Sequence, residues 1–118
     1  MTWLSPTVDE WPTNEDIAEV LDQAHDILLA DGWCQHKLHQ ETGEHCSVGA
    51  ISETTRWRYA IKIAAESALA EHLGLPRSTR WHLACERIIP WNDAPGRTID
   101  DVLDAFRGAA KDLRNKEQ

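Results

Sequence analysis

Residues 13–32, TNEDIAEVLDQAHDILLADG, carry the clearest structural pattern in the chain. Thr13 is a good N-cap, and Asp16 three residues later completes a capping box. Asp31-Gly32 should end the helix, because glycine adopts the left-handed conformation without steric cost. Between these ends, the apolar residues form a single helical stripe: Ile17, Val20, Leu21, Ala24, Ile27 and Leu28. The stretch therefore predicts an amphipathic helix with one buried face.

Two further helices are expected in the middle of the chain. The first runs from about residue 55 to 73, and its alanine-rich face favours close contact with other helices. A shorter helix follows, capped by Ser78 or Thr79. Pro90 should terminate it, because proline has no backbone N–H to continue the helical hydrogen bonds. Both helices face a common core.

The last helix begins at Thr98, with Asp101 as its capping partner. Its apolar stripe consists of Ile99, Val102, Leu103, Phe106, Ala109, Ala110 and Leu113. Together with the preceding segments, it predicts a mainly α fold of about four helices around one core.

Residues 33–47 break the helical period. Glu41-Thr42-Gly43-Glu44 is a turn signal, so this excursion is either a short β-hairpin or an irregular loop. The following segment, SVGAIS at residues 47–52, is small and apolar. It suits a buried turn of helix, in which Gly49 and Ala50 let another backbone approach closely.

The composition is that of one domain in a reducing cytoplasm. We expect residues 1–13 to form an extended arm and residues 14–118 a single helical domain, with 42% hydrophobic residues in the chain to supply a core. The formal net charge of -8 argues against direct binding to nucleic acid or to an anionic membrane surface. Three cysteines are a poor disulfide framework. We identify no signal peptide and no apolar membrane span.

Two segments go beyond these general patterns. Gly32-Trp33-Cys34-Gln35, followed by Cys46 and by Gly49-Ala50-Ile51, is similar to the front signature of an uncharacterised family, and WNDAPGRT at residues 91–98 resembles its back signature. That family is a domain of unknown function in actinobacteria, notably streptomycetes, and in the phages of mycobacteria and their relatives. The resemblance spans nearly the whole chain. It implies a small accessory protein, compatible with a phage origin and acting in the host cytoplasm, and it supplies no catalytic residues.

The densest group of metal-binding residue types lies between residues 34 and 46. It consists of Cys34, His36, His39, His45 and Cys46. Their spacing fits no standard zinc module, and adjacent residues such as His45 and Cys46 point to opposite faces of a strand. The three histidines are also absent from the family signature. We therefore expect exposed histidines beside two buried cysteines and no cofactor, with a zinc site as the alternative.

A thiol nucleophile is a second candidate. Cys46 precedes a turn of helix, whose amides would lower its pKa. His82 could act as the base, oriented by Asn92 or Asp93, while Gln35 donates to an oxyanion. This order resembles the papain-like proteases, but the chain is about half their size and lacks their glycine-rich flanks. The simpler interpretation makes Cys46 a core residue and makes Asn92 and Asp93 the caps of a tight loop.

The loop WNDAPGR at residues 91–97 also has two interpretations. Structurally, Trp91 would plug the core while Asn92 and Asp93 form side-chain-to-backbone turns. Functionally, Asp93 and Arg97 would form a small polar pocket. The structural interpretation accounts for more of the loop's residues.

The chain has six tryptophans, of which four fall at core or boundary positions: Trp33, Trp57, Trp81 and Trp91. Trp3 and Trp11 lie outside every amphipathic segment. Because tryptophan is favoured at interface hot spots, these two either pack on their own domain or dock a partner.

We predict a non-enzymatic protein-interaction module that binds a host protein or a second copy of itself. Homodimer formation through alanine-rich faces is allowed. The first alternative is a cysteine-dependent or zinc-binding enzyme. The second is an acidic mimic that binds a nucleic-acid-handling protein. The sequence contains no phosphate-binding glycine loop, GxSxG or HExxH motif.

Overall fold

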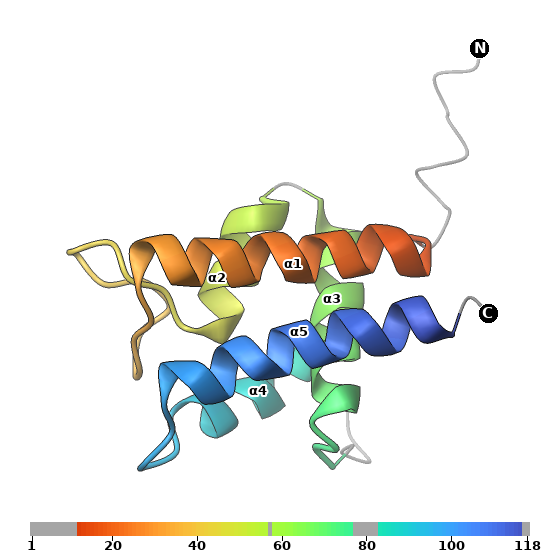
Figure 1. Ribbon diagram of the computed structural model, residues 1–118. Coiled ribbons are helices and arrows are strands. Elements are labelled where there is room, and N and C mark those ends of the chain that lie inside the picture. The colour runs from red at the N-terminus through yellow and green to blue at the C-terminus, as the bar shows by residue number, and fades with distance from the viewer. Residues whose placement is uncertain (1–11, 57, 77–82, 117–118) are drawn as a thin grey trace.

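The computed structural model describes residues 12–56, 58–76 and 83–116. These residues form five helices and no β-strand (Figure 1). The helices are α1 (Asn14–Asp31), α2 (Ser47–Thr55), α3 (Tyr59–His72), α4 (Ala84–Asn92) and α5 (Ile99–Asn115). The predicted mainly α class is confirmed, with one helix more than the four expected.

The two longest helices, α1 and α5, lie side by side and run in opposite directions (Figure 1). Both begin with the predicted capping box. The Thr13 hydroxyl accepts a hydrogen bond from the Asp16 amide at 3.0 Å, and the Thr98 hydroxyl accepts one from the Asp101 amide at 3.1 Å. The expected stop of α1 at Gly32 is also confirmed, since its φ of 98° is unfavourable for residues with a side chain.

The apolar stripes of α1 and α5 meet in the core, and α2, α3 and α4 pack behind them (Figure 1). The largest side chains completely buried there are those of Leu21, Leu28, Ile51, Leu69, Ile88 and Phe106. Among the described residues, no helix has the length and apolar character needed to span a bilayer.

The helix expected over residues 55–73 is present as α3 but begins later, at Tyr59, and ends at His72. Residues 47–52 belong to a full helix, α2, which continues to Thr55, and α3 starts only at Tyr59. Arg56, with a φ of 44°, turns the chain between them. The hydroxyl of Thr55 donates back to the Ile51 carbonyl at 2.8 Å, and such back-bonding by a β-branched residue weakens a helix.

The predicted end of a helix at Pro90 is wrong, because α4 continues to Asn92. Proline removes only its own amide, and the Asp93 amide still donates to the Ile89 carbonyl at 2.9 Å. The expected caps of this helix, Ser78 and Thr79, lie outside the described residues, and α4 begins later, at Ala84.

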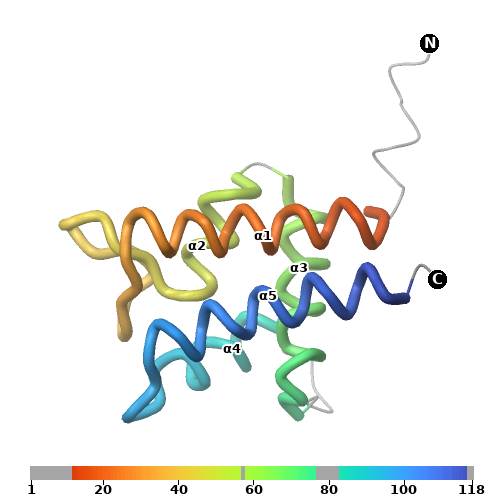
Figure 2. Tube along the Cα trace, in the orientation of Figure 1, coloured from red at the N-terminus to blue at the C-terminus, as the bar shows by residue number. Residues whose placement is uncertain are grey.

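The segment between α1 and α2 is an irregular loop rather than a hairpin. It contains only isolated bridges, from His45 to Trp33 and to His39. The predicted turn is present, with the Gly43 amide donating to the Gln40 carbonyl at 3.0 Å. In Figure 2 this loop lies at the end of the molecule where α1 ends and α5 begins.

The predicted close approach of another backbone at Gly49 is confirmed. A Cβ atom at this position would lie 2.1 Å from the Leu38 carbonyl oxygen. Because Gly49 has no side chain, the loop backbone at Leu38 can lie directly against α2.

Candidate functional site

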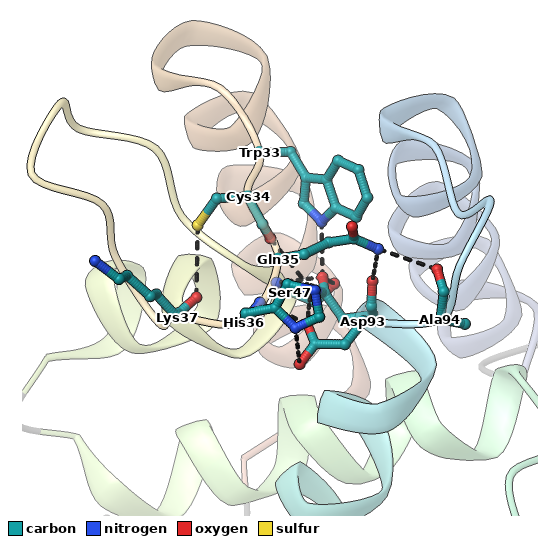
Figure 3. A network of polar contacts seen from close by, with 9 residues as sticks. Trp33, Cys34, Gln35, His36, Lys37, Ser47, Asp93 and Ala94 are labelled. Carbon is teal, nitrogen blue, oxygen red and sulfur yellow. Dashed lines mark hydrogen bonds and ion pairs between the residues drawn. The ribbon is translucent and has the colours of Figure 1, made fainter.

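The centre of the candidate site is the side chain of Asn92, which is completely buried at the end of α4. Its Oδ1 accepts hydrogen bonds from the Trp33 indole at 2.7 Å and from the backbone and hydroxyl of Ser47 at 3.0 and 2.7 Å (Figure 3). Its Nδ2 donates to the Cys34 carbonyl at 3.2 Å and to Asp93 at 3.0 Å. One amide thus joins the α1–α2 loop, the start of α2 and the end of α4.

Gln35 and Asp93 strengthen the same junction (Figure 3). The Gln35 side-chain amide donates to the carbonyls of Asn92 and Ala94, both at 3.0 Å. Asp93 Oδ1 accepts a hydrogen bond from the His36 backbone amide at 2.9 Å. His36 has a φ of 72°, a conformation that costs energy for a residue with a side chain, so this bond helps to hold a strained turn.

Trp91 and Arg97 pack together at the two ends of the α4–α5 turn. The Arg97 guanidinium lies over the Trp91 ring at 4.2 Å and donates to the Trp91 carbonyl at 2.9 Å. Arg97 also lies 3.9 Å from Asp101, whereas Asp93 contacts His36. The two residues of the suggested polar pocket therefore have separate partners, which favours the structural interpretation of this loop.

A pocket of about 160 Å³ opens between the loop and α4. It is lined by His36, Lys37, Leu38, Cys46, Ile89 and Asp93. The side chains of Leu38 and Ile89 are 47% and 37% exposed, while Cys46 is only 3% exposed. The pocket thus has an apolar rim on two sides and a buried thiol as part of its lining.

Cys46 is the N-cap of α2, as expected from its place before a helical turn. Its sulfur accepts a hydrogen bond from the Gly49 amide at 3.4 Å. However, the expected lowering of its pKa is wrong. Burial raises the pKa of the Cys46 thiol and outweighs the backbone amides, which favour the thiolate. The neutral thiol is therefore the favoured form at neutral pH.

The structure does not assemble the predicted nucleophilic arrangement around Cys46. The proposed base, His82, lies outside the described residues. Gln35 and Asn92 are already used in the hydrogen bonds of the junction, so neither is available to an oxyanion. Instead, His36 and Asp93 share the pocket with Cys46, and His36 Nδ1 lies 3.7 Å from Asp93 Oδ2.

The five candidate metal ligands also do not form one site. His39 and His45 do meet, with their Nδ1 atoms 2.7 Å apart, but His45 Nε2 faces Asp31 at 2.8 Å. The Cys34 thiol instead donates to the Lys37 carbonyl at 3.5 Å. In the described ranges, no three His, Cys, Asp or Glu side chains converge in a group suited to a metal ion.

A second pocket, which we did not predict, lies between α3 and α5 and has a volume of about 270 Å³. Its lining includes His72 and Asp112, which form a contact of 2.7 Å. A Cβ atom at Gly108 would lie 2.5 Å from the His72 ring, so this glycine makes room for the imidazole. Gly108, a glycine within a strong helical pattern, is the signal in the sequence that could have revealed the contact.

Glu66 on α3 is completely buried, which the sequence pattern did not predict. One of its carboxylate oxygens contacts Lys62 at 2.7 Å, and the other has no hydrogen-bond partner in the described part of the chain. Burial raises the pKa of Glu66 despite the neighbouring ammonium.

Several expected positions lie outside the described residues. They are the two tryptophans considered for partner docking, Trp3 and Trp11, and the expected core residues Trp57 and Trp81.

Comparison with known protein families gives a match over most of the chain. A family model described as a family of unknown function (DUF6197) covers residues 12–112. No curated protein and no solved structure matches the chain. The matched range includes Trp33 and Asn92, the two residues whose side chains meet at the centre of the junction. The chain therefore belongs to the DUF6197 family of unknown function.

Proposed function

We propose that this protein is a small, non-enzymatic binding module that presents the α1–α2 loop to a partner protein. The observation that carries the proposal is the junction around Asn92, which holds this loop against α4 while the side chain of Leu38 stays exposed. The partner is a host protein or a second copy of this chain. The setting is the cytoplasm of an actinobacterial cell, with a phage gene as one source of the protein.

The use of the polar side chains supports binding rather than catalysis. The amide groups of Gln35 and Asn92 are engaged in hydrogen bonds within the protein. Burial raises the pKa of Cys46, which keeps its sulfur in the less nucleophilic form. The polar groups of the junction therefore serve to fix the shape of a surface.

The rigidity of the loop supports the same proposal. A surface that is already ordered before binding loses less conformational entropy on association, and this increases affinity. Here the loop is held from two sides, since Asn92 anchors its beginning and the Leu38 carbonyl rests on Gly49. The exposed Leu38 side chain of the loop adds apolar surface that a partner can bury on binding.

The cysteines support the proposed compartment. Cys34, Cys46 and Cys85 are all free thiols in the structure. Free cysteines are typical of a reducing cytoplasm.

Affinity capture with the full-length chain tests the proposal. The wild-type protein, immobilised at micromolar concentration, is expected to retain a specific partner from an actinobacterial lysate, and Leu38→Asp should abolish retention. Leu29→Asp is the matched control, because Leu29 is 63% exposed on α1 and lies outside the loop. Equal capture by wild type and Leu38→Asp, or no capture by wild type, would overturn the proposal.

A thiol-dependent activity is the second candidate function. The observation that favours it is that a thiol, an imidazole and a carboxylate line one pocket, from Cys46, His36 and Asp93. Iodoacetamide labelling at neutral pH, read by peptide mass spectrometry, separates the two functions. If the protein is a binding module, iodoacetamide should label Cys46 more slowly in the folded chain than in the urea-unfolded chain. Faster labelling in the folded chain, lost in His36→Ala, would favour the thiol activity.

A further inference from the structure

Two buried cysteines, Cys34 and Cys46, follow residues that the backbone holds side by side. The Cys34 amide donates to the His45 carbonyl at 3.0 Å, and the His45 amide donates to the Gly32 carbonyl at 3.1 Å. These two bonds form the parallel bridge between Trp33 and His45. Cys34 and Cys46 come directly after the bridged pair, and the backbone of Cys46 is extended. Because successive side chains alternate between two faces, these two cysteines share one face.

The spacing of this pairing suits a disulfide bond. Extended segments paired in this way lie roughly 4.7–4.9 Å apart, and the Cα atoms of disulfide-bonded cysteines are roughly 4.4–6.8 Å apart. Burial raises the pKa of the Cys34 thiol most, and the negative charge of a Cys46 thiolate raises it further. Since electrostatic influence falls with distance, this effect also indicates that the two sulfur atoms are close.

The Cys34 sulfur is directed toward the backbone to which Cys46 is bonded (Figure 3). It donates to the Lys37 carbonyl at 3.5 Å, and the Cys46 amide donates to the next carbonyl, that of Leu38, at 2.9 Å. The Cys46 sulfur accepts from the Gly49 amide at 3.4 Å. Sulfur is a weak donor and a weak acceptor, so rotation of one thiol toward the other loses little hydrogen-bond energy.

An oxidant can reach one of these thiols. Cys46 lines the pocket of about 160 Å³ between the loop and α4. One water molecule takes up roughly 30 Å³ in the liquid, so the pocket has room for hydrogen peroxide beside the sulfur. Cys46 is therefore the thiol that meets the oxidant first.

We propose that Cys34 and Cys46 form a redox-sensitive pair, which hydrogen peroxide converts into a disulfide. The Cys46 sulfur attacks one peroxide oxygen. A sulfur–oxygen bond forms, the oxygen–oxygen bond breaks, and the thiol proton leaves with the other oxygen as water. The Cys34 sulfur then attacks the Cys46 sulfur. The sulfur–oxygen bond breaks, and its hydroxide leaves with the Cys34 proton as a second water.

The disulfide would close residues 34–46 into a covalent ring that contains the α1–α2 loop. Transient disulfides in a reducing compartment usually serve redox sensing, so the free thiols of the structure represent the reduced form of the pair. This inference does not depend on the proposed binding function.

Peptide mapping of the full-length chain tests the pairing. Trypsin places the three cysteines in three different peptides, which are residues 1–37, 38–56 and 81–87. The folded chain is treated with an equimolar amount of hydrogen peroxide, blocked with iodoacetamide and digested without reductant. The first two peptides, which contain Cys34 and Cys46, should then be joined, and dithiothreitol should separate them. Cys85→Ser is the matched control and should leave this linkage unchanged, whereas Cys34→Ser should leave a Cys46 sulfenic acid that dimedone traps.

A second measurement asks whether the fold itself brings the two thiols together. In a buffer of reduced and oxidised glutathione, the equilibrium constant for the Cys34–Cys46 linkage should be at least about ten-fold larger in the folded wild type than in the urea-unfolded chain, because the fold raises the effective concentration of one thiol at the other. Equal constants in the two states would overturn the proposal. So would linkage through Cys85, or oxidation of Cys46 in the wild type without linkage to Cys34.

Discussion

The side-chain oxygen of Asn92 accepts a hydrogen bond from the Trp33 indole, 59 residues earlier in the chain, at a distance of 2.7 Å. The same oxygen accepts two further bonds from Ser47, and the amide nitrogen donates to the Cys34 carbonyl. These bonds join residues 33–34, residue 47 and residue 92 in one buried junction. The junction in turn positions the exposed loop.

Replacement of Asn92 should cost far more stability than loss of any single partner. Asn92→Ala leaves the donors of Trp33 and Ser47 unsatisfied in a buried site, and we expect it to lower the free energy of unfolding by about 3 kcal/mol. Trp33→Phe removes one donor and should cost about 1 kcal/mol. Urea unfolding followed by circular dichroism measures both. A smaller loss for Asn92→Ala than for Trp33→Phe would contradict the central role of the amide.

Gly49→Ala should destabilise the protein, although alanine is the better helix former. Helix propensity alone predicts a gain of roughly 0.5–1 kcal/mol. However, the added methyl group would lie 2.1 Å from the Leu38 carbonyl oxygen, so the loop would have to move. We expect a net loss of about 2 kcal/mol by thermal or urea unfolding.

Gly108→Ala is the comparison for this effect, because its new methyl group would meet the His72 side chain rather than backbone. His72 is partly exposed and can rotate away, so the loss should be smaller than at Gly49. Equal losses at the two glycines would argue against the special role of the loop backbone.

Glu66→Gln should stabilise the protein more at pH 7 than at pH 4. Burial raises the pKa of Glu66 in the folded state above its ordinary value, so the folded state binds this proton more tightly than the unfolded state. The wild type therefore loses stability as the pH rises from that ordinary value through the raised one. Glutamine removes this loss because it stays neutral.

Melting temperatures at the two pH values, measured for wild type and variant, test this prediction. Glu53→Gln, which changes a more exposed carboxylate on α2, serves as the control and should change stability by less than about 0.5 kcal/mol at either pH. An advantage of Glu66→Gln that is larger at pH 4 than at pH 7 would show that the sign is wrong.

The paired histidines of the loop should have defined tautomers. Asp31 can only accept from His45 Nε2, so this nitrogen carries the proton and the Nδ1 of His45 accepts from His39. Long-range ¹H–¹⁵N NMR spectra near neutral pH should show the Nε2–H form of His45. A spectrum showing the Nδ1–H form of His45 would contradict this assignment.

The ends of α1 and α5 could be predicted because their signals are local. Each capping box joins two residues that are three positions apart, and each stripe repeats along one helix. The turn at Gly43 and the close approach at Gly49 were predictable for a similar reason, since glycine permits conformations and contacts that a side chain excludes.

Other features depend on contacts between distant segments. The extension of α4 beyond Pro90 places Asn92 in its buried site. Neither the extension nor the burial of Asn92 can be predicted from the proline itself. Glu66 fell within an alanine-rich helix as an ordinary charged residue, but packing buried it completely. The pKa of Cys46 followed burial rather than its position at the start of a helix.

The sequence by itself determined the mainly α class and the capped starts of the first and last helices. Hydrogen bonds between near neighbours and the period of a helix are sufficient for these features. Only the tertiary structure decided that Trp33 and Asn92 meet, and that Leu38, Cys46 and Ile89 enclose one pocket. Such contacts depend on how the helices pack, because burial and distance arise only when remote parts of the chain come together.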